Sequence, residues 1–145
     1  MAVVRDLIKT KGSAEVFSIL PGASVFEALQ MMSNKNIGAL MVMSGDKIEG
    51  ILSERDVVRK VEVAGKNARD TKVSEIMTAK VLYVGPDQSL EECMAVMIDK
   101  NIRHLPVMEN EKFLGLISVR DVLKEIVSEQ KFMISQLEHY IYGNR

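Results

Sequence analysis

The chain has 145 residues, of which 47% are apolar and 27% charged, and its formal net charge is -1. This composition suits one compact domain or two small units, and the balanced charge argues against nucleic-acid binding, which favours a basic face. No apolar run approaches the roughly 20 residues that cross a bilayer, the N-terminus lacks the pattern of a secretory leader, and one cysteine excludes an internal disulfide. We therefore expect a cytoplasmic protein that binds neither membranes nor nucleic acid.

The first predicted elements are a short helix over residues 2–8 and a strand over residues 17–20. A longer helix follows from Ser24, which opens a Ser-x-x-Glu capping box. That helix is expected to end at Asn36, because asparagine suits the left-handed residue after a last turn.

Next, residues 37–43 and 48–52 read as two strands joined by a short turn. A helix begins at Ser53 and runs to about Val63, and the polar stretch over residues 65–72 reads as a linker. The order from the first strand onward is strand-helix-strand-strand-helix.

The same order then repeats. The predicted elements are a short helix over residues 73–77, a strand over 81–84, a helix from Ser89 to Asn101, strands over 102–108 and 113–117, and a helix from Ser118 to about Tyr142. Pro106 removes one ladder donor, so its nitrogen must face away from the pairing strand or lie at a bulge. The last helix is longer than one unit needs. It either folds back over the core or forms a self-association surface, and we favour self-association.

The repetition is visible residue by residue. Residues 24–57 and 89–122 agree at 15 of 34 positions without a gap. The agreement is densest where Gly-Ile-Leu-Ser-Glu-Arg-Asp-Val, residues 50–57, is matched by Gly-Leu-Ile-Ser-Val-Arg-Asp-Val, residues 115–122. The chain is therefore two copies of one supersecondary unit, and such units usually bury an apolar face against each other.

These octets, the segment Ile-Arg-His-Leu-Pro-Val over residues 102–107, and the β-α-β-β-α order resemble a tandem pair of cystathionine-β-synthase (CBS) domains, a Bateman module. The resemblance implies an α/β (α+β) fold in which the two repeats pack with pseudo-twofold symmetry. It sets the expected domains as a first repeat over 1–65, a linker over 66–72, a second repeat over 73–128, and a helical extension over 129–145.

The Ser-x-x-Asp pairs, Ser53 with Asp56 and Ser118 with Asp121, have two interpretations. By spacing alone each is a capping box. A helix start also offers amides and a positive dipole end to a ligand, and aspartate, which only accepts hydrogen bonds when ionised, suits a diol such as ribose. In the CBS pairs that this chain resembles, this aspartate holds the ribose of adenosine ligands. The two roles are compatible.

Several basic residues are candidates for phosphate contacts. Arg55 and Arg120 each precede one of the aspartates, and their planar guanidinium groups suit phosphate; the alternative is a solvated or ion-paired arginine. Arg103 and His104 break the repeat symmetry, because the first repeat has Gly38 and Ala39 there. In the family, basic residues just before Leu-Pro-Val often meet the ligand's phosphates.

The resemblance thus implies two inequivalent clefts. One combines Ser53, Arg55 and Asp56 with residues near the second repeat, namely Lys80, Val81, Ile102, Arg103 and His104. The other combines Ser118, Arg120 and Asp121 with Val16, Ile37 and Gly38. The first cleft suits a charged phosphate better than the second.

We therefore predict a stand-alone regulatory module that binds an adenine nucleotide (AMP, ADP, ATP or NAD) and signals through a homodimer or a protein partner. No required cofactor, no metal site and no catalytic residue set is expected. The alternatives are a purely structural dimerisation module or an enzyme that acts on a nucleotide in the same cleft. Cys93 and His139 are expected to be a buried thiol and a surface side chain.

Overall fold

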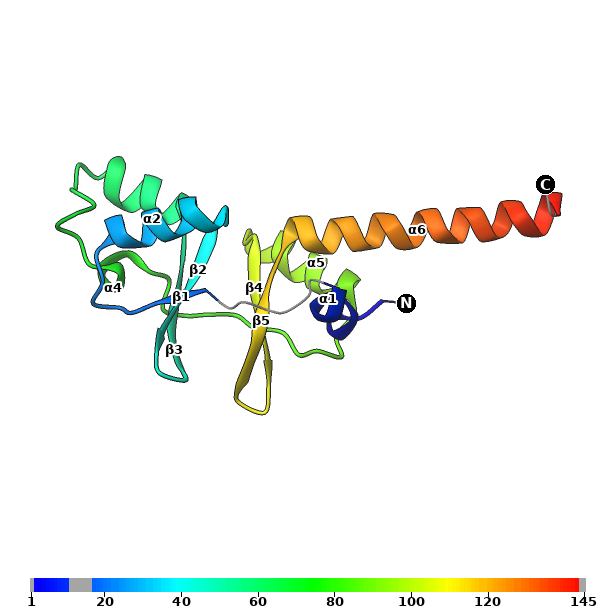
Figure 1. Ribbon diagram of the computed structural model, residues 1–145, viewed down its shortest axis with the longest axis horizontal. Coiled ribbons are helices and arrows are strands. Elements are labelled where there is room, and N and C mark those ends of the chain that lie inside the picture. Colours follow the sequence, from blue (N-terminus) through cyan, green and yellow to red (C-terminus); the bar gives the residue numbers. More distant parts are fainter. Residues whose placement is uncertain (1, 11–16, 144–145) are drawn as a thin grey trace. The chain divides into compact units, whose positions relative to one another are not determined.

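The computed structural model describes residues 2–10 and 17–143 (Figure 1). The elements, in chain order, are α1 (Val4–Thr10), β1 (Ser18–Ile19), α2 (Val25–Lys35), β2 (Ala39–Ser44), β3 (Lys47–Ser53), α3 (Glu54–Val57), the π-helix η1 (Val58–Glu62), α4 (Val73–Ile76), α5 (Leu90–Lys100), β4 (His104–Glu109), β5 (Lys112–Ser118) and α6 (Val119–Tyr142). The fold is therefore mixed α/β with two small sheets, as predicted. Apart from the strand expected over residues 81–84, the ends differ from prediction by one or two residues, which is ordinary for helix and strand termini.

The chain forms two compact units. One is Glu15–Leu82, called here the first-repeat unit, and the other combines Met1–Ala14 with Tyr83–Arg145, called the second-repeat unit. Each short helix that precedes a repeat belongs to the unit of the other repeat. Val4 and Leu7 of α1 join the second hydrophobic core, and Val73 and Ile76 of α4 join the first.

The sheet of the first-repeat unit has the order β1-β2-β3. β1 pairs parallel to β2, with Ser18 beside Met41 and Ile19 beside Val42. β2 and β3 form the predicted antiparallel hairpin. One face of this sheet packs on α2, whose buried side chains Val25, Ala28 and Met32 follow the helical spacing of the sequence.

The sheet of the second-repeat unit has two strands, β4 and β5, and here the prediction of a strand over residues 81–84 is wrong in extent. Only Val84 pairs, in a single parallel bridge to Val107. Val84 N donates to Pro106 O at 3.0 Å, and Met108 N donates to Val84 O at 2.9 Å. Extending this ladder as β1 extends along β2 would need an amide on residue 106, which proline lacks. The nitrogen of Pro106 faces this side, away from β5, as expected.

The helix ends follow their capping residues. Ser24 and Ser89 each accept a hydrogen bond at 3.1 Å from the backbone amide three residues later, which confirms the serine half of the two Ser-x-x-Glu boxes. Asn36 and Asn101 both adopt φ 53°, the left-handed conformation predicted for the residue after the last turn. These local signals set where α2 and α5 begin and end.

A close backbone approach explains the glycine that opens the first octet. Ile51 and Thr78 exchange two backbone hydrogen bonds of 2.9 and 3.0 Å, which hold the end of α4 against β3. A Cβ on Gly50 would lie 2.7 Å from Thr78 O and 2.8 Å from Met77 Sδ. Only glycine leaves room for this contact.

The polar stretch after η1 is tied to the start of α2. Val25 N donates to Thr71 O at 2.8 Å and Phe26 N donates to Ala68 O at 3.1 Å. The guanidinium of Arg69 stacks 3.8 Å from the centre of the Phe26 ring. This segment therefore supplies partners for amides that the first turn of a helix leaves unpaired.

The last helix, α6, reaches Tyr142 as predicted. Its first turns pack on the second core through Val119, Val122 and Ile126. All described residues from 130 to 143 are exposed, so the alternative in which the helix folds back over the core is wrong. Within the described ranges, no helix has both the length and the apolarity that a membrane span requires.

Candidate functional site

Each Ser-x-x-Asp pair lies where a strand passes directly into a helix. At the first, Ser53 Oγ accepts from Asp56 N at 3.1 Å, and Asp56 Oδ2 accepts from Ser53 N at 3.1 Å. At the second, the matching distances between Ser118 and Asp121 are 3.0 and 2.9 Å. The capping interpretation is thus confirmed for both pairs, and the aspartate side chain is held in one position by the backbone.

A second backbone contact fixes each helix start against its own hairpin. Glu54 N donates to Gly38 O at 3.0 Å, and Val119 N donates to Arg103 O at 2.9 Å. The start of α3 therefore lies beside Ile37 and Gly38, and the start of α6 lies beside Ile102 and Arg103. In each unit the Ser-x-x-Asp pair and the residue just before the hairpin form one local arrangement.

The two arrangements differ in charge. Lys60 Nζ lies 3.6 Å from Asp56 Oδ1 and donates to Ile76 O at 3.0 Å, so it joins the first aspartate to α4. The equivalent position of the second repeat is Glu125. The first helix start is therefore the more cationic, since Lys60 pairs with its carboxylate where the second repeat has the acidic Glu125.

Lys60 is a site residue that the sequence analysis missed. Its signal was available, because residues four apart on a helix face are neighbours and an acidic residue four before a lysine is a favourable pair. The Asp56 side chain is 20% exposed and that of Lys60 is 46% exposed. Asp56 Oδ1 can accept further hydrogen bonds, because an ionised carboxylate offers about four lone-pair sites.

The two arginines are presented differently. Arg55 is half-buried, whereas Arg120 is exposed, and Arg103 is also exposed. His104 is half-buried and pairs with Ser118 across the β4–β5 ladder, so it lies with the second helix start inside the second-repeat unit. The first-repeat unit has Ala39 paired with Ser53 at the same register.

The remaining candidates fall in the units as follows. Lys80 and Val81 follow Thr78 in the first-repeat unit, with Lys80 exposed and Val81 half-buried. Val16 lies outside the described residues. The convergence of residues from both units on one ligand stays a prediction.

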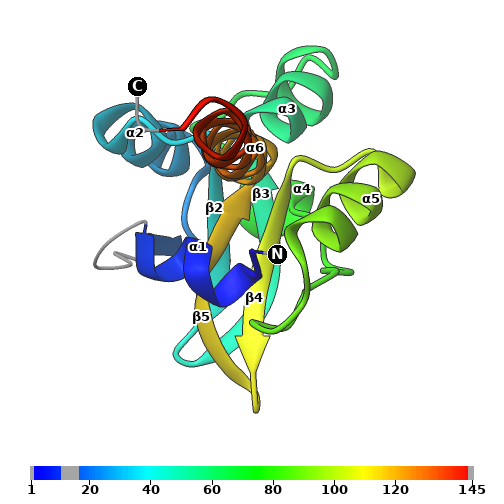
Figure 2. The ribbon, with the colours of Figure 1, turned by 90° about the vertical axis from the view of Figure 1, so that its right-hand side faces the viewer.

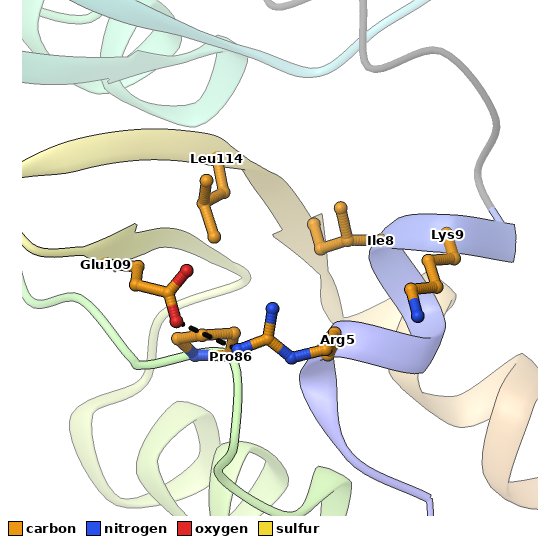
Figure 3. Close-up of a pocket in the computed structure, with 6 residues that line it drawn as sticks. All are labelled: Arg5, Ile8, Lys9, Pro86, Glu109 and Leu114. Atoms are coloured by element: carbon orange, nitrogen blue, oxygen red, sulfur yellow. Dashed lines mark hydrogen bonds and ion pairs between the residues drawn. The ribbon is translucent and has the colours of Figure 1, made fainter.

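Two other features of the second-repeat unit involve none of the Ser-x-x-Asp residues. Cys93 is fully buried, and burial, followed by the nearby carboxylates of Glu92 and Glu91, raises the pKa of its thiol to about 11. A pocket of about 220 Å³ lies between α1, the hairpin and Pro86 (Figure 3). Arg5 crosses it to reach Glu109 Oε2 at 2.8 Å, and this hydrogen bond raises the pKa of the guanidinium. The ion pair fastens α1 to the end of β4.

Comparison with known proteins agrees with this architecture. The family model of the CBS domain matches residues 4–63 and 73–128. The chain is 34% identical to the mitochondrial CBS domain-containing protein CBSX3 of Arabidopsis thaliana, over 97% of this chain and 72% of that protein.

Solved structures match as well. The crystal structure of the CBS domain of NE2398 shares 44% identity with a TM-score of 0.83, over 88% of this chain and 99% of that one. A hexameric CBS-CP12 protein from bloom-forming cyanobacteria shares 28% identity with a TM-score of 0.74, over 85% and 70%.

Two hairpin units, each ending in a capped Ser-x-x-Asp helix start, define a tandem-repeat α/β module. The chain belongs to the CBS domain family and carries two CBS repeats. Pairs of CBS domains are generally regulatory modules, and the matched relative in Arabidopsis is a longer CBS domain-containing protein.

Proposed function

We propose that this chain is a regulatory module that binds an adenine nucleotide, such as AMP, ADP, ATP or NAD, at its Ser-x-x-Asp helix starts. Occupancy would then be passed on through a homodimer or to a protein partner. Membership of the CBS family supports the regulatory role. The observation that carries the nucleotide assignment is the arrangement at Ser53–Asp56.

At that arrangement the aspartate has capacity beyond its cap. Asp56 Oδ2 is held by Ser53 N, while Oδ1 lies at the longer distance of 3.6 Å from Lys60. A fixed carboxylate with an accessible oxygen is suited to the two hydroxyls of a ribose, since both are donors. The cap therefore positions the carboxylate for the ligand, and the two roles coexist.

The surrounding charge supports a phosphate on the ligand. Arg55 and Lys60 lie within one helical turn of Asp56, and Arg59 follows on the same segment. A guanidinium forms paired hydrogen bonds to phosphate oxygens. Arg103 and His104 remain the proposed further cations, on the strength of the family resemblance. The start at Ser118, with Glu125 in place of Lys60, would accept a less charged group.

Regulation requires that the ligand prefer one state of the protein. A nucleotide shifts an equilibrium only by the difference between its affinities for the two states. The hexameric assembly of the CBS-CP12 neighbour supports signalling through contacts between copies of the chain. Nucleotide occupancy would act by favouring one such assembly over another.

Titration calorimetry with AMP, ATP and NAD tests the assignment. Asp56→Ala should raise the dissociation constant at least about tenfold, because it removes charge-assisted hydrogen bonds worth about 1.5–3 kcal/mol. The matched control is Ser24→Ala, which removes a helix cap far from the aspartate and costs about 1 kcal/mol of stability. Its affinity should equal that of the wild type.

An unchanged dissociation constant in folded Asp56→Ala protein would reject the assignment. The other functions give different results. A purely structural dimerisation module would show no thermal shift with any of the three nucleotides, whereas a ligand at 100 times its dissociation constant adds about 2.7 kcal/mol. An enzyme would turn the nucleotide over, and His104→Ala would abolish that turnover.

A further inference from the structure

The outer face of α6 is apolar and is not covered by its own unit. Five side chains on it are between 45% and 67% exposed: Leu123, Val127, Ile134, Leu137 and Ile141. Figure 1 shows the second half of α6 running on past α1 and α5, the helices of the same unit. The inner face uses other residues, Val119, Val122 and Ile126, which join the second core.

The exposed residues follow a heptad. With Gln130 they form two rows spaced seven residues apart, one of Leu123, Gln130 and Leu137 and one of Val127, Ile134 and Ile141. We call these six positions the α6 seam; Figure 2 views α6 almost end-on. In the notation of coiled coils, the row Val127, Ile134 and Ile141 occupies the a positions, which are all β-branched. The other row occupies the d positions, of which two are leucine. Among parallel coiled coils, that combination favours two strands.

Gln130 selects the register. It is the one polar residue of the α6 seam and would be buried by any partner helix. A buried side-chain amide needs both a donor and an acceptor partner. In a parallel, in-register pair it meets its own counterpart, whose amide supplies both. In the antiparallel pair built on the same seam, Gln130 would face the apolar Ile134.

The flanking charges are compatible with the same arrangement. The e positions beside the α6 seam are Lys124, Lys131 and Glu138, and the g positions are Ile126, Met133 and Tyr140. A parallel pair brings e against g, so no two like charges meet. An antiparallel pair brings e against e, which places Lys131 opposite its own counterpart and Lys124 opposite Glu138.

We propose that α6 pairs with α6 of a second copy of this chain as a parallel, in-register, two-stranded coiled coil through the α6 seam, with Gln130 as the layer that fixes register. The proposal stands independently of nucleotide binding, because none of the six positions belongs to a Ser-x-x-Asp arrangement. It also gives the second copy a defined direction, with both N-terminal ends of α6 on the same side.

Sedimentation equilibrium of the full chain tests the pairing. The variant Ile134→Asp/Leu137→Asp places charges in the α6 seam. The control Ser135→Asp/Gln136→Asp places the same charges in the same turn but on the side of α6 that faces away from the seam. The seam variant should raise the dimer dissociation constant at least about a hundredfold, whereas the control should associate as the wild type does. Equal association of the seam variant and the wild type would overturn the proposal.

Disulfide capture tests direction and register. Gln130→Cys should form a cross-linked dimer under mild oxidation, because matching d positions of a parallel pair meet at a distance that a disulfide can span. Ser135→Cys lies on the side of α6 that faces away from the seam and should not form a cross-linked dimer. The native Cys93 does not interfere, since it is buried. If Gln130→Cys stays uncross-linked while Gln130→Cys/Ile134→Cys cross-links, the helices are antiparallel and the proposal is wrong.

Discussion

The two repeats share a backbone plan and differ in the charges placed on it. Both have an antiparallel hairpin with a register shift at the equivalent position. In both, the helix after the hairpin begins with a full Ser-x-x-Asp capping box. In both, an asparagine in the left-handed conformation follows the first long helix. What the repeats keep is what the local backbone requires. One of their differences lies next to the caps, where Lys60 stands in one repeat and Glu125 in the other.

The strands and cores differ in a second way. β1 pairs with β2 at two positions, one of them Met41, whereas the equivalent residue Pro106 lacks an amide and the second repeat has a single bridge there. Buried Ala28 of the first core corresponds to buried Cys93 of the second. The scaffold therefore holds different residues at equivalent places while the helix caps stay the same.

The largest expected effect concerns the buried thiol of Cys93, which stands where the first core has Ala28. Cys93 should react with iodoacetamide at pH 8 at least about a hundredfold more slowly than a free thiol, because a pKa near 11 in place of 9.0 lowers the thiolate fraction by two orders of magnitude. Placing the thiol in the other core, by Ala28→Cys/Cys93→Ala, shows whether the first core protects a thiol equally. Rapid labelling of native Cys93 would contradict its burial.

The same raised pKa predicts a direction for stability. Because the folded thiol holds its proton to higher pH than the unfolded one, its contribution is fully present below about pH 9 and is lost as pH rises toward 11. Urea denaturation of the wild type and Cys93→Ala at pH 8 and pH 10.5 checks this, and the wild type should lose more stability between the two.

Gly50→Ala should destabilise the first-repeat unit by about 1–3 kcal/mol, since the added Cβ would meet Thr78 O at 2.7 Å and force β3 and α4 apart. Gly22→Ala is the matched control, because no atom lies within 4 Å of a Cβ there. Chemical denaturation measures both. Equal stability of the two variants would show that the contact between β3 and Thr78 is dispensable.

Lys60→Met should cost about 1 kcal/mol, because it removes the hydrogen bond to Ile76 O and the pairing with Asp56 but keeps the apolar stem. The charge pair itself adds little, given its exposure. Lys66→Met, at an exposed position, is the control. Denaturation midpoints that do not separate the two variants would remove the role of Lys60 in joining α4 to the helix start.

The smallest expected effect on stability concerns one residue with positive φ in each of the two hairpin turns. Gly45 has φ 62° in the first turn, whereas Glu111 has φ 65° in the second, a conformation that favours glycine. Glu111→Gly should therefore stabilise the protein by up to about 1 kcal/mol and Gly45→Ala should destabilise it by a similar amount. Thermal denaturation that moved both midpoints in one direction would contradict these turn geometries.

Sequence reasoning reached the fold through local signals. Ser24, Asn36 and Pro106 each act on their own backbone, so their effects could be read without knowing the tertiary structure. The placement of α1 and α4, each in the unit of the other repeat, could not be predicted in this way. It depends on which core receives Val4 and Val73. The π-helical geometry of η1 after α3 also has no signal that the pattern of residues supplied.

The candidate site divides along the same line. The capping geometry of Ser53 and Asp56 was predictable from their spacing, and Lys60 could have been found from its i,i+4 position. The binding of a ligand depends on side chains that the tertiary structure brings together. The roles of Arg103, His104 and Lys80 therefore stay predictions. The charge differences between the repeats are the observation from which inequivalent sites are predicted.

Native mass spectrometry of the protein taken directly from cells, compared with Asp56→Ala prepared in the same way, tests the central claim most directly. The account predicts an additional mass equal to an adenine nucleotide on the wild-type chain and its loss from the variant. Wild-type protein that carries no such mass, and gains none when AMP, ATP or NAD is added, would contradict it.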